Sequence, residues 1–240
     1  MRRQLGFTLV ESVVSIAVLA IIMSTVFYLF DFGREQFAIG VMRTGFSNDI
    51  RVVTTTLSRD IKLSALEGFQ LDVPKNSSFT LGGKSYTASR QALSFPTLKD
   101  WSDGTAQYDN ASGLPIYNTY ILWGCSGHTP EGNLFRIELN APNNQGQPIN
   151  AVALGAATNS LFGGLSPGVV NYGTPSYRFH RTMARSVTHM SIEYRSVVDQ
   201  PTHVEVTLRF MGRARGNTAV ERVESSEIVV RAAPGNHSTF

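Results

Sequence analysis

Cysteine is almost missing from this sequence, because Cys125 is the only one among 240 residues. A single cysteine cannot form an intramolecular disulfide, which excludes the small secreted domains that disulfides hold together. The folded part must therefore rely on packing. A zinc site is disfavoured too, because Cys125 and His128 supply two ligands where a structural site needs about four. We therefore predict that both are ordinary loop residues and that the chain holds no metal through them.

Two further absences mark the first third of the chain. Residues 12–30 contain no Asp, Glu, Lys or Arg, and no proline precedes Pro74. As a helix, residues 7–30 would extend roughly 36 Å, enough to cross a hydrocarbon core of roughly 30 Å. A cleaved secretory signal is the alternative, but the apolar run is long for one and no A-x-A cleavage site ends it. These absences predict a membrane-spanning helix.

The few charges around this run have a clear arrangement. Arg2 and Arg3 precede it, and the positive-inside rule then places the N-terminus in the cytoplasm and the rest of the chain outside. Glu11 is the single carboxylate near the start of the run. An ionised side chain is costly within a bilayer, so Glu11 requires a partner. A plain uncleaved anchor would have no reason to carry it.

The stretch Gly6-Phe7-Thr8-Leu9-Val10-Glu11 follows a basic leader and opens an apolar helix. It resembles the class III signal of type IV pilins and type II secretion pseudopilins. The resemblance implies that a prepilin peptidase cuts after Gly6 and methylates the new amine of Phe7. Glu11 lies four residues further along, on the same helical face. The resemblance also implies that Glu11 pairs with the terminal amine of a neighbouring subunit and sets the assembly register.

Beyond the membrane segment, apolar residues recur at spacings of three and four, which is typical of a helix with one face on a core. The stripe consists of Phe46, Ile50, Val53, Leu57 and Ile61. Gly33, Gly40 and Gly45 each weaken a helix by about 1 kcal/mol relative to alanine, so a bend is expected around them. We predict one helix from about residue 7 to about residue 65.

From residue 77 onward the period changes to two, which is typical of strands. The expected strands are a hairpin of residues 78–81 and 84–87 across Gly82-Gly83, then 117–123, 134–139, 190–194, 204–210 and 228–231. Stretches rich in Gly, Asn, Asp and Pro at 99–115, 140–148 and 156–175 are expected to be surface loops. Residues 190–194 and 204–210 alternate apolar and polar side chains and 228–231 closes the chain, so we expect an antiparallel meander that the amphipathic helix covers.

We therefore predict an α+β protein. A long N-terminal helix, transmembrane in one half and amphipathic in the other, packs on an antiparallel β-sheet head. The expected organisation is a leader peptide (1–6), a transmembrane helix (7–30), an amphipathic helix continuing into the head (31–66) and a β-rich globular head (67–240). The residues after the anchor are numerous enough for one head with its own core.

The layout after the anchor also resembles the larger minor subunits of this superfamily, the PilW-like minor pilins and the J-type pseudopilins. The likeness rests on residues 57–65, 190–194, 201–208 and 229–231. Major pilins usually carry a helix-loosening proline where this chain has Tyr28, and many have a disulfide that one cysteine cannot form. Both departures favour a minor component over the bulk filament subunit.

Two short motifs suggest chemistry and are set aside. The run Gly164-Leu165-Ser166-Pro167-Gly168 has the spacing of a serine-hydrolase motif. Pro167, however, has no N–H to donate to an oxyanion. The loop 100–110 could bind calcium through carboxylate and amide oxygens, but its spacing fits no EF-hand and a solvated loop is expected. The loop's candidate ligands are Asp100, Asp103, Asp109 and Asn110.

Basic and aromatic residues suggest two binding surfaces with simpler interpretations. The arginines that bracket a turn near the C-terminus could contact DNA phosphates, but Glu221 and Glu224 dilute their charge, so nucleic-acid binding is not expected. These are Arg209, Arg213, Arg215 and Arg222. Four aromatic residues could line a sugar-binding surface, but core packing explains them equally well. They are Trp101, Tyr108, Tyr117 and Trp123.

These observations predict a subunit without enzymatic activity or cofactor. It is expected to be a minor pilin-like protein, cleaved and N-methylated, that initiates or caps a type IV pilus-like filament. Its expected partners are the prepilin peptidase, the inner membrane and other pilin or pseudopilin subunits, contacted through the N-terminal helix. It would cross the inner membrane once, with its head in the periplasm or outside. A J-type minor pseudopilin and a membrane-anchored periplasmic binding domain or enzyme are the alternatives.

Overall fold

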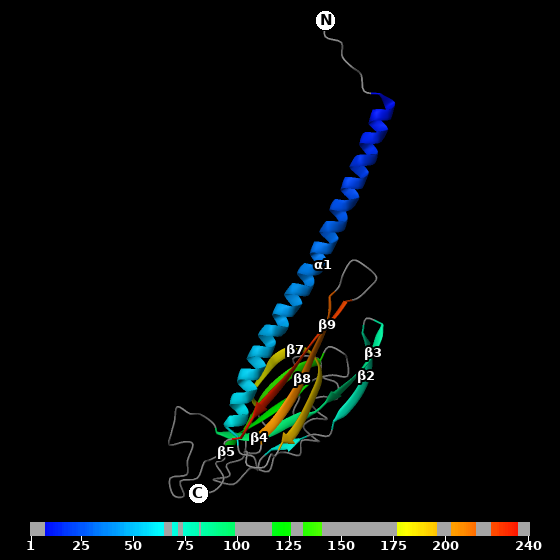
Figure 1. Ribbon diagram of the computed structural model, residues 1–240. Coiled ribbons are helices and arrows are strands. Elements are labelled where there is room, and N and C mark those ends of the chain that lie inside the picture. Colours follow the sequence, from blue (N-terminus) through cyan, green and yellow to red (C-terminus); the bar gives the residue numbers. More distant parts are fainter. Residues whose placement is uncertain are drawn as a thin grey trace, which may run out of the picture.

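The structure is a computed structural model that describes residues 8–64, 69–71, 74–81, 83–98, 117–125, 132–140, 177–195, 203–214 and 222–234. The expected loops at 99–115 and 156–175, and all but the first residue of 140–148, lie outside these residues. The fold is α+β, as predicted, with one long helix and one sheet. One half of the helix lies across the sheet and the other half projects well beyond it (Figure 1).

The helix α1 spans Leu9–Lys62 without interruption, 54 residues in all. The prediction of one helix through both the apolar and the amphipathic half is therefore confirmed. Gly33, Gly40 and Gly45 lie inside it, and a β-carbon at any of the three would meet nothing within 4 Å. Their conformational cost does not break the helix, and Figure 1 shows a gently curved rod through this region. Leu63 is the C-cap of the helix, and its backbone N–H donates a hydrogen bond to the carbonyl of Arg59.

Among the described residues, nine strands form a single sheet. They are β1 (Gln70–Leu71), β2 (Lys75–Leu81), β3 (Lys84–Arg90), β4 (Ala92–Leu98), β5 (Tyr117–Cys125), β6 (Gly132–Asn140), β7 (Tyr177–Arg195), β8 (His203–Ala214) and β9 (Arg222–Ala232). The pairing order is β1-β4-β5-β6-β7-β3-β2, and β8 pairs with both β7 and β9. All pairs are antiparallel except β3 with β7, which run parallel and share the single residue pair Arg90 and Met190. The head is thus a mixed sheet with one parallel pairing.

All of the expected strands are present. The hairpin of β2 and β3 turns between Leu81 and Lys84, which lie opposite each other, and Gly83 has φ +74°. The strands β5 and β6 include the expected residues 117–123 and 134–139, and β7, β8 and β9 form the expected meander. The strand β4 was not expected. Residues 92–97 are all buried, so the strand lacks the alternation by which a half-exposed strand is recognised.

The strand β7 begins at Tyr177, well before the expected Met190, and it bends in the middle. Ser186 has φ +57°, a region that non-glycine residues rarely occupy. The pairing register also shifts between Val187 and His189. The residues of β7 up to Val187 pair with β6, and those from Val187 onward pair with β8. One strand therefore joins the two parts of the sheet.

The core lies between the amphipathic half of α1 and the sheet. Val53, Leu57 and Ile61 of the predicted stripe are completely buried, Phe46 is buried and Ile50 packs at the margin. The ring of Phe46 lies 6.1 Å from the ring of Phe210 on β8. The helix can lie close to β8 because residue 212 of that strand is a glycine. A β-carbon at Gly212 would lie 2.7 Å from the sulfur of Met42 on the helix.

A buried ion pair joins the end of α1 to the sheet. Asp60 is 1% exposed and Arg136 on β6 is 7% exposed. The Arg136 Nε donates to Asp60 Oδ2 at 2.5 Å and its Nη2 donates to Oδ1 at 3.2 Å. The indole N–H of Trp123 donates to the same carboxylate at 3.1 Å. Burial acts to lower the pKa of Arg136, but its hydrogen bonds and charge interactions with Asp60 and Glu138 raise that pKa above the ordinary value.

Removing Asp60 should leave the Nε and Nη2 donors of the buried Arg136 without their carboxylate, although Glu138 still pairs with its Nη1. We expect Asp60→Ala to lower the free energy of unfolding by about 3 to 5 kcal/mol, measured by urea unfolding of the full chain in detergent with circular dichroism. Arg59→Ala is the matched control, because its exposed guanidinium also lies near Asp60, at 3.5 Å. That control should change stability by less than about 1 kcal/mol. Equal effects of the two substitutions would contradict the role given to the buried pair.

Candidate functional site

The described chain begins where the predicted processing site ends. Gly6 and Phe7 lie outside the described residues, so cleavage after Gly6 and methylation of Phe7 stay predictions. Thr8 is the N-cap of α1, with an extended backbone at φ −75° and ψ 150°. Its side-chain oxygen accepts the backbone N–H of Glu11 at 3.3 Å, and the hydroxyl of Ser12 donates to its carbonyl at 3.4 Å. The helix start is therefore built from residues of the motif itself.

Glu11 completes a reciprocal capping arrangement with Thr8. Its Oε2 accepts hydrogen bonds from the backbone N–H and from the hydroxyl of Thr8, both at 3.0 Å. A carboxylate at this place also faces the positive end of the helix dipole. The chain itself thus supplies part of the stabilisation that the charge of Glu11 requires near a membrane. Pairing with the terminal amine of a neighbouring subunit, which a single chain does not test, stays a prediction.

The first half of α1 is apolar and unburied. Its large apolar side chains from Leu9 to Phe32 are between 48% and 81% exposed. An 18-residue window of the helix reaches a mean hydropathy of 2.5, and none of that window is buried within the chain. Among the described residues this is one helix long and apolar enough to cross a membrane. The hydroxyl of Thr25 donates to the carbonyl of Ile21 at 2.9 Å, so this polar group is satisfied within the helix.

The contact between helix and head begins one turn after the charged residues Asp31, Arg34 and Glu35. Ile39 is the first buried residue of α1. The guanidinium of Arg43 then makes a forked ion pair with Glu224 on β9, at 3.0 to 3.1 Å. Arg43 is largely exposed, so the pair orients the helix more than it stabilises the fold.

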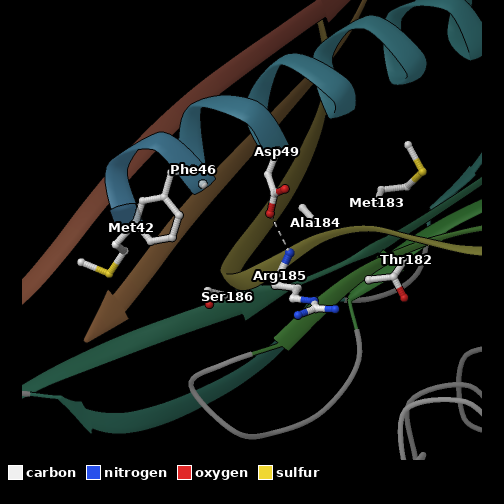
Figure 2. Close-up of a pocket in the computed structure, with 9 residues that line it drawn as sticks. Met42, Phe46, Asp49, Thr182, Met183, Ala184, Arg185 and Ser186 are labelled. Carbon is white, nitrogen blue, oxygen red and sulfur yellow. Dashed lines mark hydrogen bonds between the residues drawn. The ribbon is translucent and has the colours of Figure 1, made fainter. Parts of the chain in front are cut away.

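A groove opens between α1 and the bend of β7 (Figure 2). Its volume is about 520 Å³. The side chain of Asp49 points from the helix across the groove, and its Oδ2 accepts the backbone N–H of Arg185 at 3.1 Å. The residues lining it are Met42, Gly45, Phe46, Asp49, Thr182, Met183, Ala184, Arg185 and Ser186. This lining supplies one carboxylate, one guanidinium and two hydroxyls, a set without a thiol or imidazole to act as nucleophile or base.

The other residues that the sequence suggested for sugar, DNA or metal binding do not form one site among the described residues. Trp123 is fully buried and bonded to Asp60, so it belongs to the core and cannot take part in a sugar-binding surface. Arg209 is ion-paired with Glu227 at 2.7 Å. The structure does not describe the other side chains of the two predicted binding surfaces. It also does not describe His128, the loop 100–110 or the run 164–168. In the described part of the chain, no three His, Cys, Asp or Glu residues gather as metal ligands.

Two residues show where sequence reasoning fell short. Cys125 was expected in a loop, which is wrong, because it ends strand β5 and is 4% exposed. Asp60 was not singled out as a buried charge. The sequence did contain a signal for this. Asp60 lies beside Leu57 and Ile61 on the apolar face of the helix, and Arg136 lies two residues after Leu134, on the same face of its strand. Opposite charges on two apolar faces indicate a buried pair.

The Cys125 thiol should be inert in the folded protein. Burial raises its pKa to about 12, so at pH 8 only about one thiol in ten thousand would be ionised. We expect iodoacetamide at pH 8 to leave the native chain unlabelled and to label it fully in urea, as measured by intact mass. Rapid labelling of the native chain would contradict the burial of this strand end.

The capping role of Thr8 can be tested apart from assembly. We expect Thr8→Val to lower the hydrogen-exchange protection of the first helical turn about fivefold, because it removes both the N-cap acceptor and a donor to Glu11. Thr8→Ser keeps the hydroxyl and should keep the protection. The measurement is hydrogen exchange of the full chain in lipid nanodiscs. Equal protection in the two variants would show that the hydroxyl does not cap the helix.

Comparison with known proteins agrees with this N-terminal arrangement. Residues 1–27 match the family model described as the prokaryotic N-terminal methylation motif. Comparisons of the chain with curated proteins and with solved structures gave no match. The motif implies processing by a prepilin peptidase and assembly with other pilin subunits. Together with the long apolar helix, it supports a membrane-anchored, single-pass protein of the type IV pilin-like superfamily.

Proposed function

We propose that the protein is a minor pilin-like subunit that is cleaved after Gly6, methylated at Phe7 and built into a type IV pilus-like filament, which it initiates or caps. The observation that carries the proposal is the N-terminal methylation motif at residues 1–27, continued by an uninterrupted helix. In this function the protein acts by assembly and performs no reaction of its own.

The exposure pattern of α1 supports a helix that passes from the membrane into contact with other subunits. Its apolar half is not buried by any of the described residues, so it needs either lipid or other helices around it. Phe37 and Val41 are 74% and 57% exposed, and they lie beyond the charged turn where the membrane segment ends. Large apolar side chains in water are typical of an interaction surface. A neighbouring pilin-like helix lying along α1 would cover them.

The shape of the chain supports a minor role at a filament end. The helix is continuous where major pilins usually have a proline, and Tyr28 lies within it. The head is a nine-stranded mixed sheet with long segments between strands. A large head suits a filament tip better than a repeating lattice. A J-type pseudopilin shares these features, and an anchored binding domain or enzyme would share the helix but have no use for Glu11.

The decisive experiment compares the membrane-extracted chain made with and without a prepilin peptidase, by intact mass and N-terminal peptide. We expect a chain beginning at methylated Phe7 only with the peptidase, and a chain beginning at Met1 for Gly6→Leu in both cases. In cells with a complete filament system, Glu11→Gln should be processed normally but recovered in filaments about tenfold less, because a charged hydrogen bond is lost. Glu35→Gln on the same helix is the matched control.

A wild-type chain that still begins at Met1, with the peptidase active on a known substrate, would overturn the proposal. Equal incorporation of the Glu11 and Glu35 variants would remove the assembly role of Glu11 while leaving processing intact. Immunolabelling along the whole filament, instead of at its end, would contradict the tip position. Loss of secretion without loss of pili in a deletion strain would favour the pseudopilin alternative.

A further inference from the structure

The hairpin of β2 and β3 is attached to the rest of the sheet along one narrow seam. Among the described strands β2 pairs with β3, and β3 continues the sheet through its parallel pairing with β7. That pairing contains one residue pair, Arg90 with Met190. An extended parallel ladder would supply a regular series of backbone hydrogen bonds, which one residue pair cannot. The attachment therefore depends on the few hydrogen bonds that other groups add.

Side chains supply two of the hydrogen bonds at this seam. The backbone N–H of Gln91 donates to the carbonyl of Met190 at 3.0 Å. The side-chain oxygen of Gln91 accepts the N–H of Ile192 at 2.6 Å, and the Nδ1 of His189 accepts the N–H of Ser89 at 3.2 Å. The contacts of Gln91 do not change with pH in the physiological range, because an amide does not titrate. The contact of His189 does change, because its acceptor is an imidazole nitrogen.

The direction of this hydrogen bond determines the protonation state of His189. A backbone N–H can only donate, so Nδ1 must carry no proton and the neutral ring holds its proton on Nε2. In the imidazolium ion both nitrogens are donors. Protonation would therefore place a donor against the N–H of Ser89 and abolish the contact. A single proton thus removes one of the few bonds that hold β3 to β7.

The charged groups around His189 favour its neutral form. Burial lowers the pKa of His189, Arg209 lowers it further, and Glu227 raises it. Arg209 is the register partner of His189 on β8, and Glu227 on β9 is ion-paired with that arginine. From β3 the facing group is Ser89, followed along the strand by the buried Arg90. On β7 itself, the next charged side chains on this face are Glu193 and Arg195, which pair with each other at 2.7 Å.

We propose that His189 is a pH-dependent latch that holds the β2–β3 hairpin against β7 when neutral and loosens it when protonated. Because the folded state favours the neutral ring, the contribution of the latch is complete above the ordinary pKa of histidine, about 6.5. This contribution is lost as the pH falls through the pKa of His189 in the folded protein, which lies below that ordinary value. Gln91 remains bonded throughout, so the hairpin is loosened locally and the meander of β8 and β9 stays intact. The proposal does not depend on the function proposed above.

The test is hydrogen exchange of the full chain in nanodiscs between pH 7.5 and pH 5, expressed as protection factors corrected for intrinsic rates. We expect protection of residues 84–91 to fall about fivefold at the acid end, the effect of one lost hydrogen bond. Protection of β8 and β9 should not change. His189→Asn places an amide oxygen near the position of Nδ1, so it should keep the protection at every pH. His189→Ala should lack it at every pH.

His203→Asn is the matched control, because it removes another strand histidine and should leave the pH response of residues 84–91 unchanged. A wild-type chain whose β3 protection does not depend on pH would overturn the latch. The same conclusion would follow if His189→Asn lost protection in acid as the wild type does. Loss of protection in β8 and β9 together with β3 would show general acid unfolding and would also overturn it.

Discussion

The arrangement of this protein depends on one buried contact, the ion pair of Asp60 with Arg136 at the end of α1. Apolar packing has little direction, so an amphipathic helix lying on a sheet through apolar side chains alone could shift along it. The hydrogen bonds from Arg136 and Trp123 to the carboxylate of Asp60 are directional, and breaking them would leave buried donors without an acceptor. They select one register of helix on sheet, from which the position of Phe46 over β8 and of Arg43 beside Glu224 follows.

Because α1 is continuous, a constraint at its C-terminal end also orients its N-terminal end. The membrane segment and the head share one helix, and the first buried residue, Ile39, comes only a few residues after the charged turn that ends at Glu35. The apolar half can therefore associate with lipid or with other helices while the head keeps its place at the other end. At the N-terminus the structure is local, since Thr8 and Glu11 form hydrogen bonds with each other. The two ends of the molecule are built independently and joined by the helix.

The bend of β7 is the second feature on which the head depends. Next to Ser186, at Val187, the pairing with β6 ends and the pairing with β8 begins, and the groove that Asp49 bridges lies at this bend. After the bend the other edge of β7 receives β3, in the one parallel pairing of the sheet. A parallel neighbour with a single residue pair needs hydrogen bonds from side chains, and His189 is one of them. The bend thus explains both the groove and the pH-sensitive seam.

Much of the candidate site could be predicted from the sequence because it is encoded in consecutive residues. The spacing of Gly6, Phe7 and Glu11, the charge-free run and the absence of proline are local signals, and the family model matches that same stretch. The amphipathic stripe and the alternating strands are local as well, so the helix and the C-terminal meander were confirmed. The strand β4 could not be predicted, because burial of all its described side chains removes the alternation. The prediction that Cys125 lies in a loop was wrong because the alternation of apolar and polar residues does not show at which residue a strand ends.

By itself, the sequence determined the membrane helix, its processing motif and the class of fold, since each rests on periodicity or spacing within a short stretch. Only the tertiary structure decided the partners of Asp60, the bend of β7, the parallel seam and the hydrogen bond of His189. Each of these joins residues that are far apart in the chain, as Asp60 and Arg136 or Ser89 and His189 are. Such contacts depend on which strands become neighbours, and that choice follows from the packing of the whole sheet against α1.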